Sequence, residues 1–263
     1  MKAAILQSAY LGISSGRLDY YLRATSLKGV KVLLLGEYTL TRFFKELEKT
    51  PLSMLKEQSQ RQIENLKELA KKYETVIVAP LISVKKGKIY KEVFIFFPGR
   101  TVRYSQQVLM PYPHWNERRF FANENGGFKE PPVFAIDGVK FGVMGGFEIH
   151  FNRFFDSFAK RGVHALLIPT VSTFGSNQRW REILKTRAFL SNCYLLRSNR
   201  IGEYVDRGVE WKFYGESMCV DPDGKIESIC GDKEELLICE IDKERVKKSK
   251  KEWGFRALNR QLQ

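Results

Sequence analysis

The chain has 263 residues, of which 43% are hydrophobic and 28% charged. This balance is typical of a folded globular protein and excludes a disordered chain. No apolar run approaches the roughly 20 residues that span a bilayer, and the chain starts on a strand pattern rather than a signal peptide. We therefore expect a cytoplasmic protein with no membrane partner.

The formal net charge of +14 is the one unusual feature of the composition. A strong positive charge is compatible with nucleic-acid binding. However, the basic residues are scattered, and the densest run, at 242–253, is interleaved with acidic residues. A solvated surface is the favoured interpretation, and nucleic-acid binding is the weakest functional alternative.

The cysteines and histidines do not form a metal-binding pattern. The four cysteines lack the spacing of a zinc site or a disulfide framework, and the three histidines are scattered. We expect reduced thiols, no metal and no cofactor. The residues concerned are Cys193, Cys219, Cys230, Cys239, His114, His150 and His164.

In the first half of the chain, apolar runs alternate with helical periodicity. Strands are predicted at 3–8, 32–37, 75–83, 88–97 and 101–110, and helices at 15–28 and around 55–73. The run at 32–37 is apolar almost throughout, which is typical of a strand buried on both faces. The strands at 88–97 and 101–110 flank Pro98-Gly99-Arg100, which indicates a hairpin.

The second half begins with an aromatic-rich loop at 111–127 that we expect to fold over another part of the molecule. Strands are then predicted at 133–136, 139–144, 164–169, 193–198, 214–220, 235–242 and up to residue 229, and helices at 151–161, 179–192 and in the basic tail. No linker or repeat interrupts the pattern. We predict a single mixed α/β domain over 1–263, with sheets covered by helices and a basic helical C-terminal tail.

Polar or unusual residues follow several predicted strands, where α/β proteins place their ligands. Glu37 ends the second strand, Gln107 lies near the end of the second hairpin strand, and Gly145-Gly146 ends the strand at 139–144. A tight turn and a nest of backbone amides that binds an anion are both open interpretations of the two glycines.

Several motifs, in order along the chain, are similar to those of the nitrilase superfamily, the carbon-nitrogen hydrolases. They are LGEY, LMPYPHWNERRFF, FGVMGGFEI, LLIPT with a following tryptophan-containing helix, LRSNRIGE, YGESMCVDPDG and ELLICEIDKERV. The resemblance implies a four-layer αββα sandwich, self-association as a homodimer or larger oligomer, and a site with Glu, Lys and Cys. In that site the carboxylate accepts the proton of the thiol, the thiolate attacks an amide or nitrile carbon, and the ammonium stabilises the oxyanion.

Carried over by register, the family's catalytic Glu falls on Glu37 and its second Glu on Glu117. The Lys position falls on Gln107 and the Cys position on Gly146. Two of the three catalytic side chains are therefore expected to be missing. Losing a nucleophile costs on the order of 10⁶ in turnover in a serine hydrolase. We accordingly interpret the chain as a degenerate, non-hydrolytic member that binds a small amide, carboxylate or amine, or serves as a partner subunit.

The alternative is an active amidase, most similar to the carbamoyl-amine hydrolases, that uses another nucleophile or a water activated by Glu37. Cys193 is interpreted as a core thiol, and Ser105 has no base beside it. Glu37, with no lysine predicted next to it, is expected to have a pKa raised by burial. The residues predicted to line the pocket are Gly145, Phe147, Trp115 and Ser105.

Overall fold

Two six-stranded sheets form the centre of the computed structural model, which describes residues 1–12, 14–123, 126–206, 208–255 and 258. The first sheet has the order β16-β1-β2-β3-β4-β5 and the second the order β15-β14-β11-β10-β9-β8. Their strands are β1 Lys2–Gln7, β2 Val32–Leu35, β3 Val76–Lys85, β4 Lys88–Phe97, β5 Arg100–Ser105, β8 Val133–Ile136, β9 Val139–Val143, β10 Ala165–Thr170, β11 Tyr194–Asn199, β14 Met218–Val220, β15 Ile226–Ile229 and β16 Glu235–Glu240.

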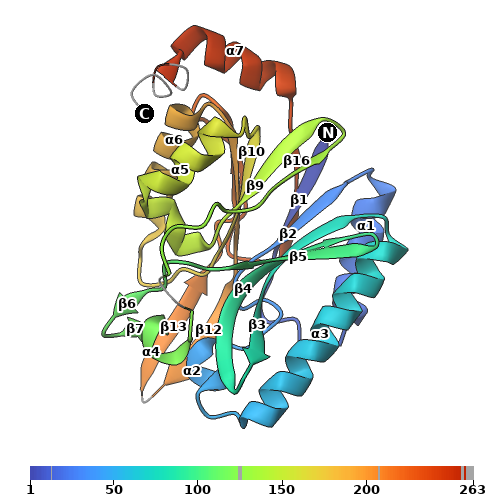
Figure 1. The fold of residues 1–263 in the computed structure, drawn as a ribbon, viewed down its shortest axis with the longest axis vertical. Coiled ribbons are helices and arrows are strands. Elements are labelled where there is room, and N and C mark those ends of the chain that lie inside the picture. Colours follow the sequence, from blue (N-terminus) through green and yellow to red (C-terminus); the bar gives the residue numbers. More distant parts are fainter. Residues whose placement is uncertain (13, 124–125, 207, 256–257, 259–263) are drawn as a thin grey trace.

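Helices cover the outer face of each sheet (Figure 1). On the first sheet lie α1 Gly16–Leu27 and α3 Leu52–Lys72, and on the second lie α5 Asn152–Lys160 and α6 Asn177–Ser191. The remaining helices are α2 Phe44–Leu47, α4 Glu117–Phe120, η1 Gly146–His150 and α7 Lys243–Trp253. The predicted four-layer αββα sandwich is confirmed.

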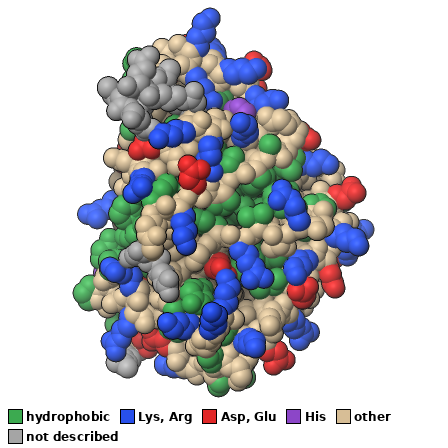
Figure 2. All heavy atoms as spheres, viewed as in Figure 1, with side chains coloured by type: hydrophobic (Ala, Val, Ile, Leu, Met, Phe, Trp, Pro, Cys, Tyr) green, Lys and Arg blue, Asp and Glu red, His purple; other side chains and the backbone are tan. Residues whose placement is uncertain are grey.

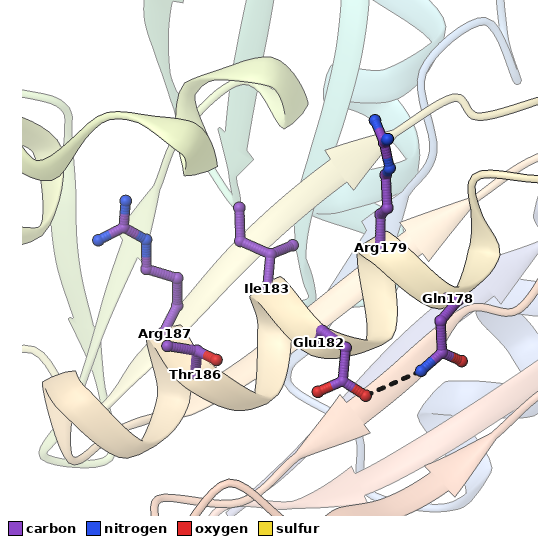
Figure 3. Close-up of a pocket in the computed structure, with 6 residues that line it drawn as sticks. All are labelled: Gln178, Arg179, Glu182, Ile183, Thr186 and Arg187. Carbon is purple, nitrogen blue, oxygen red and sulfur yellow. Dashed lines mark hydrogen bonds between the residues drawn. The ribbon is translucent and has the colours of Figure 1, made fainter.

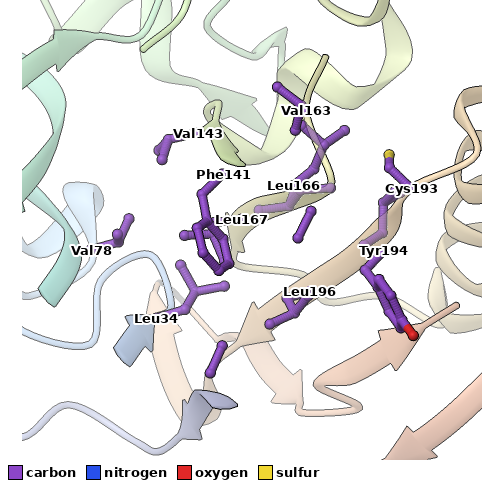
Figure 4. Close-up of a cluster of buried hydrophobic side chains, with 14 of the residues drawn as sticks. Leu34, Val78, Phe141, Val143, Val163, Leu166, Leu167, Cys193, Tyr194 and Leu196 are labelled. Atoms are coloured by element: carbon purple, nitrogen blue, oxygen red, sulfur yellow. The ribbon is translucent and has the colours of Figure 1, made fainter. Parts of the chain in front are cut away.

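The alternation of side chains in β2 shows why the layers stack in this order. Val32 and Leu34 point into the core between the two sheets, whereas Leu33 and Leu35 pack against the helix layer. Figure 4 shows Leu34 opposite Phe141 of the second sheet. Because successive strand residues point to opposite faces, a strand covered on both faces must be apolar throughout.

The short elements cluster beyond one end of the sheets. They are the β6 Pro111–Tyr112 and β7 Trp115–Asn116 pair and the β12 Ile201–Asp206 and β13 Val209–Tyr214 hairpin. The sequence analysis missed this hairpin because charged residues mask its alternation. Trp211 and Phe213 nevertheless bury one face of β13 against Phe43, at ring separations of 5.7 and 5.4 Å. The expected strand at 101–110 is also too long, since β5 ends at Ser105.

Basic side chains are spread over the face seen in Figure 2, with acidic side chains among them. Across the part of the chain that the structure describes, no helix is both long and apolar enough to cross a membrane.

Candidate active site

A cavity of roughly 610 Å³ lies at the ends of the central strands, next to the two short strand pairs. Its walls are largely aromatic. The lining residues are Glu37, Met110, Tyr112, His114, Trp115, Gly146, Phe147, His150, Thr170, Val171, Ser172, Thr173, Phe174, Ser176, Arg179, Trp180 and Ile183. Of the predicted pocket residues, Trp115 and Phe147 line this cavity, whereas Gly145 and Ser105 are not among its walls.

Glu37 belongs to a buried cluster of charges behind this cavity. The Nζ of Lys91 lies 2.7 Å from Glu37 Oε2 and 2.7 Å from Glu117 Oε1. The hydroxyl of Tyr38 also donates to Glu117 Oε1 at 2.7 Å. The two glutamates placed by family register are therefore joined through one ammonium. Of these four residues, only Glu37 reaches the cavity wall.

For both Glu37 and Lys91, burial and the opposite charges within this cluster shift the pKa in opposite directions. Burial raises the pKa of Glu37, and the negative charge of Glu117 adds to this, while the Lys91 ammonium opposes both. For Lys91, burial alone lowers the pKa, but the two carboxylates outweigh it and the net direction is upward. The expected rise at Glu37 therefore occurs, although a lysine does lie beside it.

Lys91 is the site residue that the sequence analysis missed. Glu37 was expected to have no cation beside it, whereas Lys91 lies next to it. This lysine belongs to β4 and not to the segment after β5, where the family register placed the Lys position. A signal was present in the sequence, because Lys91 has the same strand parity as Val93 and Ile95, which point into the core between the sheets. A lysine on a buried face requires a carboxylate partner.

Gln107 does not lie in the cavity. Its side chain donates to Tyr104 Oη and to the Lys129 carbonyl, both at 2.8 Å, and accepts from the Lys129 amide. The neighbouring Gln106 is the buried one, and its side chain packs against Gly145. The family register therefore predicts the wrong glutamine of the pair, since Gln107 points away from the elbow and Gln106 points toward it.

Ser105 also lies outside the site. Its hydroxyl accepts a hydrogen bond from Asn123 at 3.1 Å.

The Gly145-Gly146 elbow leads from β9 into the short helix η1. The Gly146 amide donates to Glu37 Oε1 at 3.2 Å, and the Gly145 amide donates to Glu148 Oε2 at 2.6 Å. The two amides therefore bind two different carboxylates of the protein, which is a correction to the interpretation of a shared anion nest. Neither glycine has a positive φ. The reason for glycine at 146 is close packing, since a Cβ there would lie 2.5 Å from the Pro169 carbonyl oxygen.

Glu148 holds the elbow and the segment after β5 together. Its carboxylate accepts from the Tyr104 hydroxyl at 2.9 Å and from the backbone amides of Gly145, Gln107 and Val108. Burial raises the pKa of Glu148 to about 7, even though these four donors favour its charged form. These contacts give Glu148 a structural role at the elbow.

The candidate cysteine nucleophiles lie outside the cavity. All four cysteines are buried free thiols, and none of them lines the cavity. The hydrogen bond with the neighbouring Cys239, together with burial, keeps the pKa of Cys219 well above its usual value, which disfavours the reactive thiolate. In the described ranges, no group of three His, Cys, Asp or Glu side chains could hold a metal ion.

Comparison with known proteins identifies a matching family and similar structures. The family model "Carbon-nitrogen hydrolase" matches residues 14–251. N-carbamoylputrescine amidase of Solanum lycopersicum is 26% identical over 248 residues, which cover 88% of this chain and 82% of the relative. Deaminated glutathione amidase of Synechocystis is 26% identical over 69% of this chain and 70% of the relative.

Two solved structures share the fold. A carbon-nitrogen hydrolase from Helicobacter pylori G27 has a TM-score of 0.87 at 23% identity, covering 97% of this chain and 94% of its own. A nitrilase-superfamily amidase from Nesterenkonia AN1 has a TM-score of 0.78 at 19% identity, covering 100% of this chain and 98% of its own.

Proposed function

Because this chain belongs to the carbon-nitrogen hydrolase family, we propose that it keeps the family's pocket as a binding site for a small organic molecule and does not hydrolyse what it binds. The observation that carries this proposal is the elbow. By the register of the sequence motifs, Gly146 is predicted to stand at the position of the family's nucleophile. It has no side chain, and a Cβ at 146 would lie 2.5 Å from the Pro169 carbonyl oxygen. Covalent catalysis needs a nucleophile at this point.

The charge cluster supports the same proposal. The Lys91 ammonium lies 2.7 Å from each of two carboxylates and does not reach the cavity wall. An ammonium held in this way is not available to a developing oxyanion, and losing one oxyanion donor costs about 10²–10³ in turnover. The cavity therefore has aromatic walls, but it has no nucleophilic side chain at Gly146 and no contact with the Lys91 ammonium.

A panel of amides and nitriles tests the proposal, with ammonia release as the readout. We expect no release above the rate in buffer. The Glu37→Gln variant is the control, because it removes the base that a water-activating route would need. Turnover that exceeds buffer and is lost in Glu37→Gln would establish the active-amidase alternative instead.

The double variant Gly146→Cys with Gln107→Lys should not hydrolyse amides, since a Cβ at 146 would meet the Pro169 backbone and Gln107 points away from the elbow. Homodimer formation, inferred from family resemblance, stays a prediction that light scattering tests.

A further inference from the structure

Arg197 is a fully buried cation beside the cavity. It lies on β11 with no exposed surface, and its Cζ is 4.5 Å from the ring centre of Trp180, a cavity wall residue. Within the described chain no ion pair joins Arg197 to an acid, and the nearby Glu216 carboxylate is bound to Arg181 at 2.7 Å. A buried guanidinium without an anionic partner is costly in a protein interior.

Neutral oxygens hold this guanidinium in place. Its Nε donates to Thr170 Oγ1 at 3.0 Å, one terminal nitrogen donates to Ser172 Oγ at 2.8 Å, and the other donates to the Glu216 carbonyl at 3.2 Å. Burial lowers the pKa of Arg197, yet an arginine remains protonated at neutral pH. The positive charge is therefore fixed, and no carboxylate of the described chain is bonded to it.

Ser172 connects the Arg197 guanidinium to the cavity through a hydrogen bond. Its Oγ accepts from Arg197 and lines the cavity, and its own proton has no acceptor in the described part of the chain. A hydroxyl that accepts from a cation is a polarised donor, because hydrogen bonds in a chain strengthen one another. Thr170 differs, since its hydroxyl is already placed between Ser198 and Asn199 oxygens.

A second cation lines the same cavity. Figure 3 shows Arg179 extending from the start of α6, apart from Glu182, which is bonded to Gln178 at 3.0 Å. No ion pair of Arg179 occurs among the described residues, and its side chain lines the cavity. The cavity therefore offers an anion the polarised Ser172 hydroxyl and the Arg179 guanidinium, while Arg197 acts only through Ser172.

We propose that the Ser172–Arg197 end of the cavity recognises the carboxylate of a small organic acid whose apolar body lies against the aromatic walls. A ligand ammonium would instead have to approach Glu37, which already accepts from Lys91 and from the Gly146 amide. This inference rests on the proposed function and narrows the ligand to one chemical class.

Three probes of one shape but different charge test the inference: phenylacetate, phenylacetamide and 2-phenylethylamine. We expect titration calorimetry to show phenylacetate binding about tenfold or more tightly than the amide, since a charge-assisted hydrogen bond is the stronger kind. Equal binding of acid and amide, or preference for the amine, would overturn the carboxylate assignment while leaving ligand binding intact. Binding of none of the three would overturn the proposed binding function as well.

Point variants test which side chains bind the ligand carboxylate. Ser172→Ala should reduce the acid-to-amide preference about fivefold or more, and Arg179→Gln should weaken only the acid and flatten its salt dependence. The matched control is Ser176→Ala, because Ser176 lines the same cavity but donates to the Thr173 carbonyl. An equal loss in Ser172→Ala and Ser176→Ala would overturn the assignment to Ser172. Unchanged melting curves of both variants would show that folding is intact.

Discussion

Lys91 and Arg197 are two buried cations near one cavity, and their surroundings differ in kind. Lys91 lies between Glu37 and Glu117, each 2.7 Å away, whereas Arg197 is held by hydroxyl and carbonyl oxygens and by the Trp180 ring, with no carboxylate bonded to it among the described residues. A charge that is paired within the protein contributes to holding the fold together. A charge that is solvated only by neutral groups keeps its attraction for an anion from outside.

Loss of the paired cation should have the largest effect on stability. Lys91→Met leaves two carboxylates buried without a counter-charge, which typically costs about 3–5 kcal/mol. Urea denaturation measures this loss. The control is Lys67→Met on α3, whose exposed ion pair with Glu64 should contribute about 0.5 kcal/mol or less. Similar losses in the two variants would contradict the description of Lys91 as a buried neutralising charge.

Glu148 is a buried acid whose surroundings resemble those of Arg197. Its carboxylate accepts hydrogen bonds from neutral donors, and no ion pair of Glu148 occurs among the described residues. Its folded pKa of about 7 lies above the ordinary value of 4.5, so the folded state binds the proton more tightly. Its contribution to stability is therefore greatest below pH 4.5 and is lost as the pH rises through 7. We expect a loss of about 3 kcal/mol between pH 4.5 and 8, against a flatter profile in Glu148→Gln.

Parallel urea titrations of wild type and Glu148→Gln at pH 5 and pH 8 test this sign. The wild-type stability should fall more than that of the variant as the pH rises. A wild-type gain over this interval, relative to Glu148→Gln, would contradict a raised pKa.

Gly146→Ala should have an intermediate effect on the stability of the fold. The added methyl group would lie 2.5 Å from the Pro169 carbonyl oxygen and 3.0 Å from Thr170 Cγ2, so the elbow must shift. Overpacking of this kind costs about 1–3 kcal/mol. Thermal denaturation measures it, with Gly126→Ala as control because a Cβ there meets no atom within 4 Å. A neutral Gly146→Ala would show that the elbow has room for a side chain.

The unpaired cation should have the smallest effect on folding. Arg197→Met removes a desolvated charge, and this gain offsets part of the loss of its hydrogen bonds, which contribute about 1 kcal/mol each, so the net loss should be smaller than that of Lys91→Met. Urea denaturation should therefore separate Arg197→Met clearly from Lys91→Met. A loss at Arg197 as large as that at Lys91 would remove the distinction between the two cations.

The layered fold was predictable because strand and helix periodicities are long and regular. Gly146 and Glu37 could also be located from sequence, since both follow buried strands. Lys91 could not be predicted because its partners, Glu37 and Glu117, are distant in sequence. Only the fold brings together β4, the turn after β2 and the start of α4. The register counted from Met110 and Pro111 predicts Gln107 rather than Gln106, and the segment after Ser105 is a loop without a fixed periodicity that would show which side chain turns inward.

One nuclear magnetic resonance measurement tests the central claim that the pocket binds without cleaving. Phenylacetamide is mixed with the protein and followed over days. The account predicts saturation transfer from protein to the amide, lost on competition with phenylacetate, and an amide spectrum that stays unchanged. Appearance of phenylacetate and ammonia faster than in buffer, and dependent on Glu37, would contradict it.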